Sequence, residues 1–229
     1  MRHVQIGARI VGYDLRQAAR RRLAMSIDER GLRVGAPMGL SLGAIEDFIR
    51  SHGAWVLDKL DDFGSRRVRR QISIRHGVHL PLLDGEVEVR IGSGGNRFRW
   101  HADHLELSAR PGADLDALAR RALQSKAMDV FSLRLDHFAP LMGHRAPALS
   151  LSSARTRWGS CSRETGIRLN WRLIHLPLEL VDYVVIHELS HLRQMNHSAR
   201  FWAEVASQCP DWRTRRERLK HRGAEIPII

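Results

Sequence analysis

The run His187-Glu188-Leu189-Ser190-His191 is the stretch on which the fold and its chemistry are centred. Residues four apart share one face of an α-helix, so this spacing lets the rings of His187 and His191 point at a single metal ion. Glu188 lies one residue further round, close enough to an open coordination position to move a water proton. His197 follows six residues later and supplies a third nitrogen. Three protein ligands and one open position are typical of a catalytic zinc site rather than a structural one.

The residues around this run favour a buried helix. Pro177 suits a first helical turn, where a missing N–H group costs nothing. The following positions are mostly apolar, as expected of a helix inside the core: Leu180, Tyr183, Val184, Ile186 and Leu189. We expect this helix to end near Asn196 in a left-handed conformation, which would let His197 fold back toward the other two histidines. Ser198 can then cap a second helix that runs to about residue 208.

Two other ligand sets fit parts of the pattern. The histidine spacing equals that of the metzincins, but Gln194 stands where they have glycine, and no methionine follows His197. With Glu204 in place of His197, the site would be a His-His-Glu set. Imidazole at this spacing suits zinc, so we favour His197 and keep Glu204 as the alternative.

Further motifs flank the helix in a fixed order and at close spacing: Arg157-Trp158-Gly159-Ser160-Cys161-Ser162, Ile167-Arg168-Leu169-Asn170-Trp171-Arg172-Leu173, Asn196-His197-Ser198 and Phe201-Trp202. In these motifs the chain resembles the YgjP-like zinc metallopeptidases, which are relatives of the SprT-like and WLM groups. The resemblance implies a zincin-like fold, bound Zn2+ and hydrolysis of peptide bonds in a protein or peptide substrate. It also implies that His187, His191 and His197 are the metal ligands and that Glu188 is the catalytic carboxylate.

The expected chemistry follows from these parts. Zinc lowers the pKa of a bound water from about 15.7 toward about 7, and Glu188 would take the water proton and deliver it to the leaving amine. The developing oxyanion needs a donor besides zinc, for which Arg157, His175 and Tyr183 are the candidates. The alternative function is a non-catalytic zinc-binding module that docks nucleic acid or a protein partner through its basic surface. A closed site with Cys161 as fourth ligand would favour that alternative.

Composition limits the class of protein. The chain has 229 residues, of which 43% are hydrophobic and 27% charged, as is usual for globular proteins. It has no apolar run long enough to span a membrane, and its first residues lack the apolar core of a secretory signal. Only two cysteines are present, Cys161 and Cys209, which fits a reduced, cytoplasmic protein. We expect Cys161 to be a packed thiol rather than a ligand or nucleophile.

The net charge of +12 comes from 37 Lys and Arg against 25 Asp and Glu, and the basic residues are unevenly placed along the chain. The densest basic runs are residues 20–22, then Arg66-Arg67 with Arg69-Arg70, and finally residues 213–222. Such runs can bind nucleic-acid phosphates or an acidic protein. No nucleic-acid-binding motif accompanies them, so we favour a solvated face as their explanation. The sequence leaves nucleic-acid binding open and does not indicate an oligomeric state.

The pattern of strands and helices predicts an α+β protein, with a zincin-like catalytic lobe at residues 111–229 and an N-terminal β-rich lobe with one helix at residues 1–110. Pro111-Gly112 marks the expected boundary. The first lobe should hold strands at 23–27 and 32–34 around a turn at 28–31, a helix from Ser41 to about 63, and strands at 87–91, 97–101 and 105–107. The second should hold a helix from Asp114 to about 138 and strands at 149–154 and 167–174.

The strand at 167–174 bears on substrate binding because it precedes the metal-binding helix. At the edge of a sheet, it could pair with an extended peptide that binds as an added strand. Inside the sheet, its backbone groups would already be paired. Edge position cannot be inferred from a local pattern, so both interpretations stay open.

Overall fold

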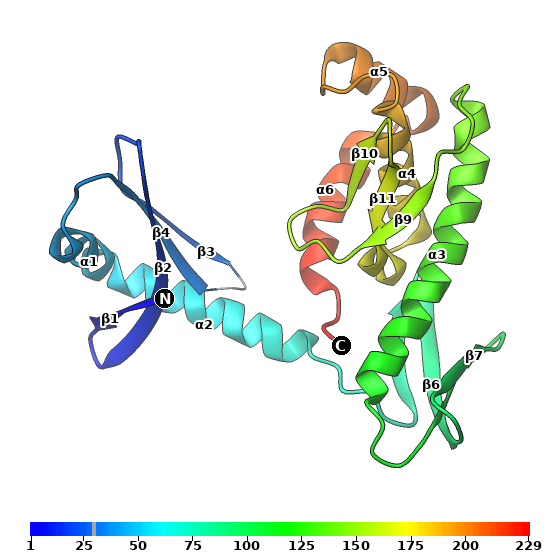
Figure 1. Ribbon diagram of the computed structural model, residues 1–229, viewed down its shortest axis with the longest axis horizontal. Coiled ribbons are helices and arrows are strands. Elements are labelled where there is room, and N and C mark those ends of the chain that lie inside the picture. Colours follow the sequence, from blue (N-terminus) through cyan, green and yellow to red (C-terminus); the bar gives the residue numbers. More distant parts are fainter. Residues whose placement is uncertain (29–30) are drawn as a thin grey trace. The chain divides into compact units, whose positions relative to one another are not determined.

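The computed structural model describes residues 1–28 and 31–229, except for the side chains of 66–69 and of 224. The predicted turn residues Glu29 and Arg30, and the basic side chains of Arg66, Arg67 and Arg69, therefore lie outside the described part. The chain divides into two compact units, Met1–Gln71 and Ile72–Ile229 (Figure 1). Each unit has its own buried hydrophobic core, and each is described by itself.

The first unit is a four-stranded sheet with two helices. Its strands have the order β1-β2-β4-β3, and its elements are β1 (Arg2–Ile6), β2 (Arg9–Ala18), β3 (Ala24–Asp28), β4 (Gly31–Pro37), α1 (Leu42–Ser51) and α2 (Gly53–Arg70). Alternate strand residues such as Val4 and Val34 are buried, as is Ile45 of α1. Ser41 caps α1 by accepting a hydrogen bond from the Ala44 N–H at 3.2 Å. The helix predicted from Ser41 to about 63 is in fact two helices, because the backbone of His52 leaves the helical conformation.

The second unit holds two sheets and four α-helices among the described residues. One sheet has the order β5-β6-β8-β7 and the other β10-β11-β9. The elements are β5 (Val78–Leu82), β6 (Gly85–Ser93), β7 (Arg97–Trp100), β8 (His104–Ala109), α3 (Leu115–Leu141), β9 (Leu149–Ser152), β10 (Gly159–Ser162), β11 (Gly166–Asn170), η1 (Trp171–His175), α4 (Leu178–Ser190), α5 (Ala199–Gln208), α6 (Trp212–Arg222) and η2 (Gly223–Glu225). The α+β class predicted from the sequence is confirmed.

The boundary expected at Pro111-Gly112 falls inside the second unit, about forty residues after the division that the structure shows. Strands β5 to β8 belong with the second unit because their apolar face is covered by α3. Leu105 and Leu107 of β8 share one core with Leu118 and Phe131 of α3. The glycine turn after β8 connects two parts of this core rather than two units.

Packing around α4 fixes the position of the run from His187 to His191. Most of this helix is buried, and α3 is tied to it by a bidentate ion pair between Arg134 and Asp182 at 2.6 and 2.9 Å. Strand β11 lies in the middle of its sheet, between β10 and β9, so its backbone is paired on both sides. Of the two interpretations of the 167–174 segment, the internal one is correct, and its last residues form the short helix η1 instead of strand. The edge strand that contacts α4 is β10.

No helix within residues 1–28 and 31–229 is both long enough and apolar enough to cross a membrane.

Candidate functional site

Three histidines converge at the end of α4. His187 lies in its last turn, His191 follows directly after it, and His197 lies six residues further on, just before α5. One ring nitrogen from each of the three lies within 4.8 Å of the others. The Nε2 atoms of His187 and His197 are 3.2 Å apart. The sequence prediction that His197 folds back toward the other two is therefore what the geometry shows.

The turn after α4 differs from the one we expected. The helix ends at Ser190, and His191 is its C-cap in a right-handed conformation, so the predicted left-handed end at Asn196 is wrong. The chain turns early because 3-10-type hydrogen bonds, which join residues three apart, replace the α-helical ones. One example is the bond from the Leu192 N–H to the Leu189 carbonyl at 3.0 Å. The Nδ1 atom of His191 lies 3.0 Å from the Gln194 carbonyl oxygen and donates to it. This bond leaves the Nε2 lone pair of His191 free to bind a metal.

Aromatic rings hold the third histidine. The imidazole of His197 stacks on Trp202 of α5 with ring centroids 5.6 Å apart. Trp202 in turn stacks on Trp212 of α6 at 4.0 Å, with the two planes 14° apart. Ser198 caps α5, as predicted, by accepting a hydrogen bond from the Phe201 N–H at 3.4 Å. Helices α5 and α6 thus fix the ring that the sequence places farthest from the run at 187–191.

The donor set suits a zinc ion. Two nitrogens bound to one tetrahedral zinc lie about 3.3 Å apart, given Zn–N distances of about 2.0–2.1 Å, and the 3.2 Å between His187 and His197 is close to that. Burial and the neighbouring histidines lower the pKa of His187 to about 3, and burial also lowers the pKa of His197. Both rings are neutral near pH 7, which is the form that binds metal.

Glu188 is a buried carboxylate beside this cluster, with only 5% of its surface exposed. Burial raises its pKa to about 7, and the positive charge of Arg157 acts in the opposite direction. A cation bound by the histidines would lower this pKa again and favour the ionised form. Glu188 can therefore exist as either base or acid close to neutral pH.

Gly159, the first residue of β10, makes room for that carboxylate. A Cβ atom at this position would lie 2.7 Å from both Cγ and Cδ of Glu188, closer than real side chains approach each other. The preceding loop is held by Asn170, whose side-chain amide donates to the carbonyl of Ala154 at 2.7 Å and to that of Arg157 at 3.3 Å. The two motifs, at residues 157–162 and 167–173, are thus held together and cover the side of the site where Glu188 lies.

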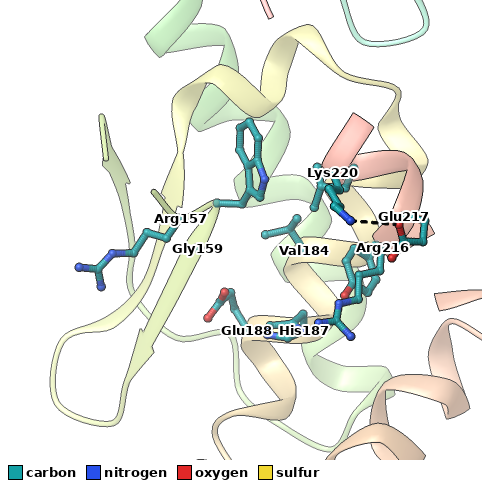
Figure 2. Close-up of a pocket in the computed structure, with 11 residues that line it drawn as sticks. Arg157, Gly159, Val184, His187, Glu188, Arg216, Glu217 and Lys220 are labelled. Carbon is teal, nitrogen blue, oxygen red and sulfur yellow. Dashed lines mark ion pairs between the residues drawn. The ribbon is translucent and has the colours of Figure 1, made fainter. Parts of the chain in front are cut away.

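A cavity of about 650 Å³ opens beside His187 and Glu188 (Figure 2). Figure 2 shows Gly159 on one side of it and Arg216, Glu217 and Lys220 of α6 on the other, with Val184 between them. The Arg216 guanidinium lies next to His187, and its charge lowers the pKa of that imidazole. Arg157 also lines the cavity, but its guanidinium points away from α6.

The other residues that the sequence singled out divide into two groups. Tyr183 lines the cavity with Arg157, its ring 6.0 Å from that of His187. His175 lies elsewhere: it is buried, and its Nδ1 atom donates to the Pro81 carbonyl at 2.7 Å. Two of the three candidates for the oxyanion donor thus border the site.

Glu204 and Cys161 are placed away from the histidine cluster. The carboxylate of Glu204 pairs with Arg193 at 3.1 Å, so the structure brings His197 rather than Glu204 to the other histidines. Cys161 is half-buried on β10, and burial, together with the charge of Glu188, raises the pKa of its thiol to about 11. It is a neutral thiol near pH 7, as expected of a packed cysteine, and it is not part of the ligand group among the described residues.

Sequence reasoning missed α6 and its part in the site. The stretch from Arg213 to Arg222 reads as a basic surface run because it carries no clear apolar stripe. Among the residues of this helix, only Trp212 and Leu219 are buried. The signal that could have found it is the pair Trp202 and Trp212, two aromatic residues too large to leave in water.

Comparison with known proteins adds to this geometry. The sequence matches the model of the YgjP-like metallopeptidase domain over residues 21–222. Two solved structures are similar. The metallopeptidase zymogen of Pyrococcus abyssi abylysin is 23% identical, with 44% of this chain and 99% of that chain covered at a TM-score of 0.38. The zymogen of Methanocaldococcus jannaschii jannalysin is 17% identical, with 40% and 95% covered at a TM-score of 0.37. No curated protein matches the sequence.

Proposed function

Because this chain belongs to the YgjP-like family of metallopeptidases, we propose that it is a zinc-dependent endopeptidase in which His187, His191 and His197 hold the metal and Glu188 is the general base. Family membership makes proteins or peptides its substrates. The observation that best supports the assignment of residues is the convergence of three imidazole nitrogens beside a buried carboxylate at one end of α4.

The proposed mechanism gives each residue one task. Zinc, when bound, would act as a Lewis acid on the scissile carbonyl and lower the pKa of the attacking water. Ionised Glu188 accepts the proton of that water and then delivers it to the leaving amine. Gly159 leaves the space in which the carboxylate sits, and the Gln194 carbonyl keeps His191 in the tautomer with a free Nε2.

The test of this proposal separates metal binding from turnover. We expect Glu188→Gln to bind one zinc per chain, like the wild type, and to lose peptide cleavage by about 10²- to 10⁴-fold, since the amide cannot take the water proton. Metal content is measured by elemental analysis, and cleavage with a mixture of unstructured peptides. A Glu188→Gln protein that is fully active would refute the mechanism.

Two further variants test the ligand set. His197→Ala should lose zinc affinity, because only two ligands remain. Glu204→Gln is the matched control: it alters a carboxylate on α5 that pairs with Arg193 and should keep both zinc and activity. Loss of zinc in Glu204→Gln, with zinc kept in His197→Ala, would instead support the His-His-Glu set.

The same measurements decide between the enzyme and the non-catalytic zinc module that docks nucleic acid or a protein. Zinc bound in full without any peptide cleavage would favour the module. The position of Cys161 outside the group of convergent donors supports the enzyme, because the cluster then keeps an open coordination position.

A further inference from the structure

Beyond the metal site, the cavity beside it carries charges that the proposed mechanism does not use. Three cationic residues line it, Arg157, Arg216 and Lys220, against the carboxylates Glu188 and Glu217. Glu188 is assigned to catalysis, and Glu217 forms a long ion pair with Lys220 at 3.8 Å. Arg157 and Arg216 form no salt bridge with any described carboxylate, which leaves the cavity with an excess of positive charge.

Three arginines of α6 that do not line the cavity form ion pairs: Arg215 with Asp211 at 2.9 Å, Arg218 with Glu179, and Arg222 with Glu225 at 3.4 Å. Arg213, which also does not line the cavity, lies over Trp212 with its guanidinium carbon 4.6 Å from the ring centroid. Arg216, which lines the cavity, rests instead on the face of Trp202 with its guanidinium carbon 5.4 Å from the ring centroid. The same Trp202 stacks on His197, so the aromatic ring that supports a proposed metal ligand also supports this guanidinium.

Arg216 thus has an aromatic contact and no neutralising carboxylate among the described residues. A guanidinium over an indole face keeps all five of its N–H donors available at its edge. Its fork geometry matches a carboxylate, which it binds through two parallel hydrogen bonds. Figure 2 shows the Arg216 guanidinium beside His187, on the side of the cavity opposite to Gly159.

We infer that Arg216 is a specificity residue that binds a carboxylate of the substrate next to the bond to be cleaved. This rests on the proposed peptidase function and adds the substrate class: peptides with an acidic side chain, or a free C-terminal carboxylate, close to the scissile bond. When a peptide binds for cleavage, the side chains that flank the scissile bond lie on either side of the metal. The cavity is large enough to hold one of these side chains with its carboxylate.

The experiment begins with wild-type protein loaded with zinc and a mixed peptide library, whose cleavage sites are read by mass spectrometry. Matched fluorogenic peptides are then made from the best site, with Glu changed to Gln in one set and the C-terminal acid changed to amide in another. We expect one of these changes to lower kcat/KM by about ten- to a hundredfold, as for loss of one charge-assisted hydrogen bond. Which set responds identifies the source of the carboxylate.

Variants of α6 assign the preference to one residue. Arg216→Gln should cleave the acidic and neutral peptides at nearly equal rates, and Arg216→Glu should favour peptides with Lys or Arg at the same position. Arg213→Gln is the matched control, since Arg213 lies one turn away on the same helix, also rests on a tryptophan (Trp212, at 4.6 Å), and does not line the cavity. It should keep the wild-type preference. Thermal melting checks that all three variants are folded.

Different failures have different meanings. Wild-type cleavage without any preference for a carboxylate, or an unchanged preference in Arg216→Gln, would overturn the inference and leave the peptidase assignment intact. A preference for phosphoserine over Glu in the matched peptides would also overturn it, in favour of a phosphate site. If the zinc-loaded wild type cleaves no peptide in the library, the proposed function fails, and this inference fails with it.

Discussion

At the scale of single residues, the space for Glu188 depends on the missing side chain at position 159. We expect Gly159→Ala to push the carboxylate aside, because the added methyl group would lie 2.7 Å from two of its carbon atoms. Displacement of a catalytic group by about 1 Å costs on the order of a hundredfold in rate. Cleavage should therefore fall strongly while zinc binding is kept, as measured by kcat and by metal content.

Gly92→Ala is the control for this prediction. Gly92 lies on β6 in the same unit, and a Cβ atom there would meet nothing within 4 Å. It should leave kcat unchanged. Equal activity of Gly159→Ala and the wild type would contradict the prediction, because the Glu188 carboxylate could then work without the space at position 159.

His175 makes the stability of the second unit depend on pH. Burial lowers its pKa from 6.5 to about 4, so the folded protein keeps it neutral where the unfolded chain already takes up a proton. The free energy of unfolding is therefore unaffected by this group above about pH 6.5 and falls as the pH drops toward 4. A shift of this size corresponds to about 3 kcal/mol.

Urea unfolding at pH 7.5 and 5, with a chelator present, measures this effect. His175→Asn keeps a donor in place of Nδ1 for the Pro81 carbonyl and removes the titration. We expect the variant to lose less stability between the two pH values than the wild type. A loss that is the same in both proteins would mean that other groups cause it.

Local spacing explains why the convergence of His187 and His191 could be predicted from the sequence and their surroundings could not. His187 and His191 are one helical turn apart, and any helix places them together. Gly159 and Arg216 reach the site only because β10 and α6 both contact α4, and those contacts are set by packing between distant segments. A sequence pattern shows that Arg216 is basic but not what it faces.

At the scale of elements, the helix caps could be predicted from local sequence patterns, but the order of the strands in the sheets could not. The caps at Ser41, Asp114 and Ser198 were predicted and are confirmed by hydrogen bonds, because a cap depends only on residues three apart. Strands β1, β2, β5 and β10 were not predicted. The choice between β11 and β10 as the free edge depends on pairing with β9, 18 residues earlier for the Ser150–Arg168 pair.

The free edge of β10 leads to a prediction about the substrate. We expect an extended peptide to bind as an added strand along Gly159–Ser162, because β10 is an edge strand and its first residue, Gly159, lies against Glu188. In such a pairing only every second amide of the peptide faces the strand. N-methylation of substrate amides, one at a time, should lower kcat/KM at alternate positions near the scissile bond. Tolerance of methylation at every position would contradict strand addition.

At the scale of the whole molecule, the division between Gln71 and Ile72 can be tested with fragments. We expect residues 72–229 to fold alone and bind one zinc, because the core that surrounds α4 draws only on this unit. A fragment of residues 111–229, cut at the boundary that the sequence suggested, should be poorly folded, since it loses the strands that cover α3. Circular dichroism, cooperative melting and metal content distinguish the two fragments. A stable, zinc-binding 111–229 fragment would favour the later boundary.

The basic runs belong to the same scale, and their sequence interpretation was only partly right. Within α6, ion pairs to neighbouring carboxylates account for Arg215, Arg218 and Arg222, as expected of a solvated face. Arg216 departs from that interpretation, because it faces a cavity. The cytoplasmic location and the binding of nucleic acid stay predictions.

The first and last residues of the second unit lie side by side. The N–H of Ile72 donates to the Ile228 carbonyl at 2.9 Å, and Arg120 holds the Ile229 carbonyl at 2.9 Å, so the start and the finish of this unit lie next to each other. A short peptide could join them without stretching, and new ends could be opened at Gly112, in the exposed turn between β8 and α3. The catalytic unit could thus be circularly permuted, or inserted into a surface loop of another protein, without disturbing the segment from 157 to 202.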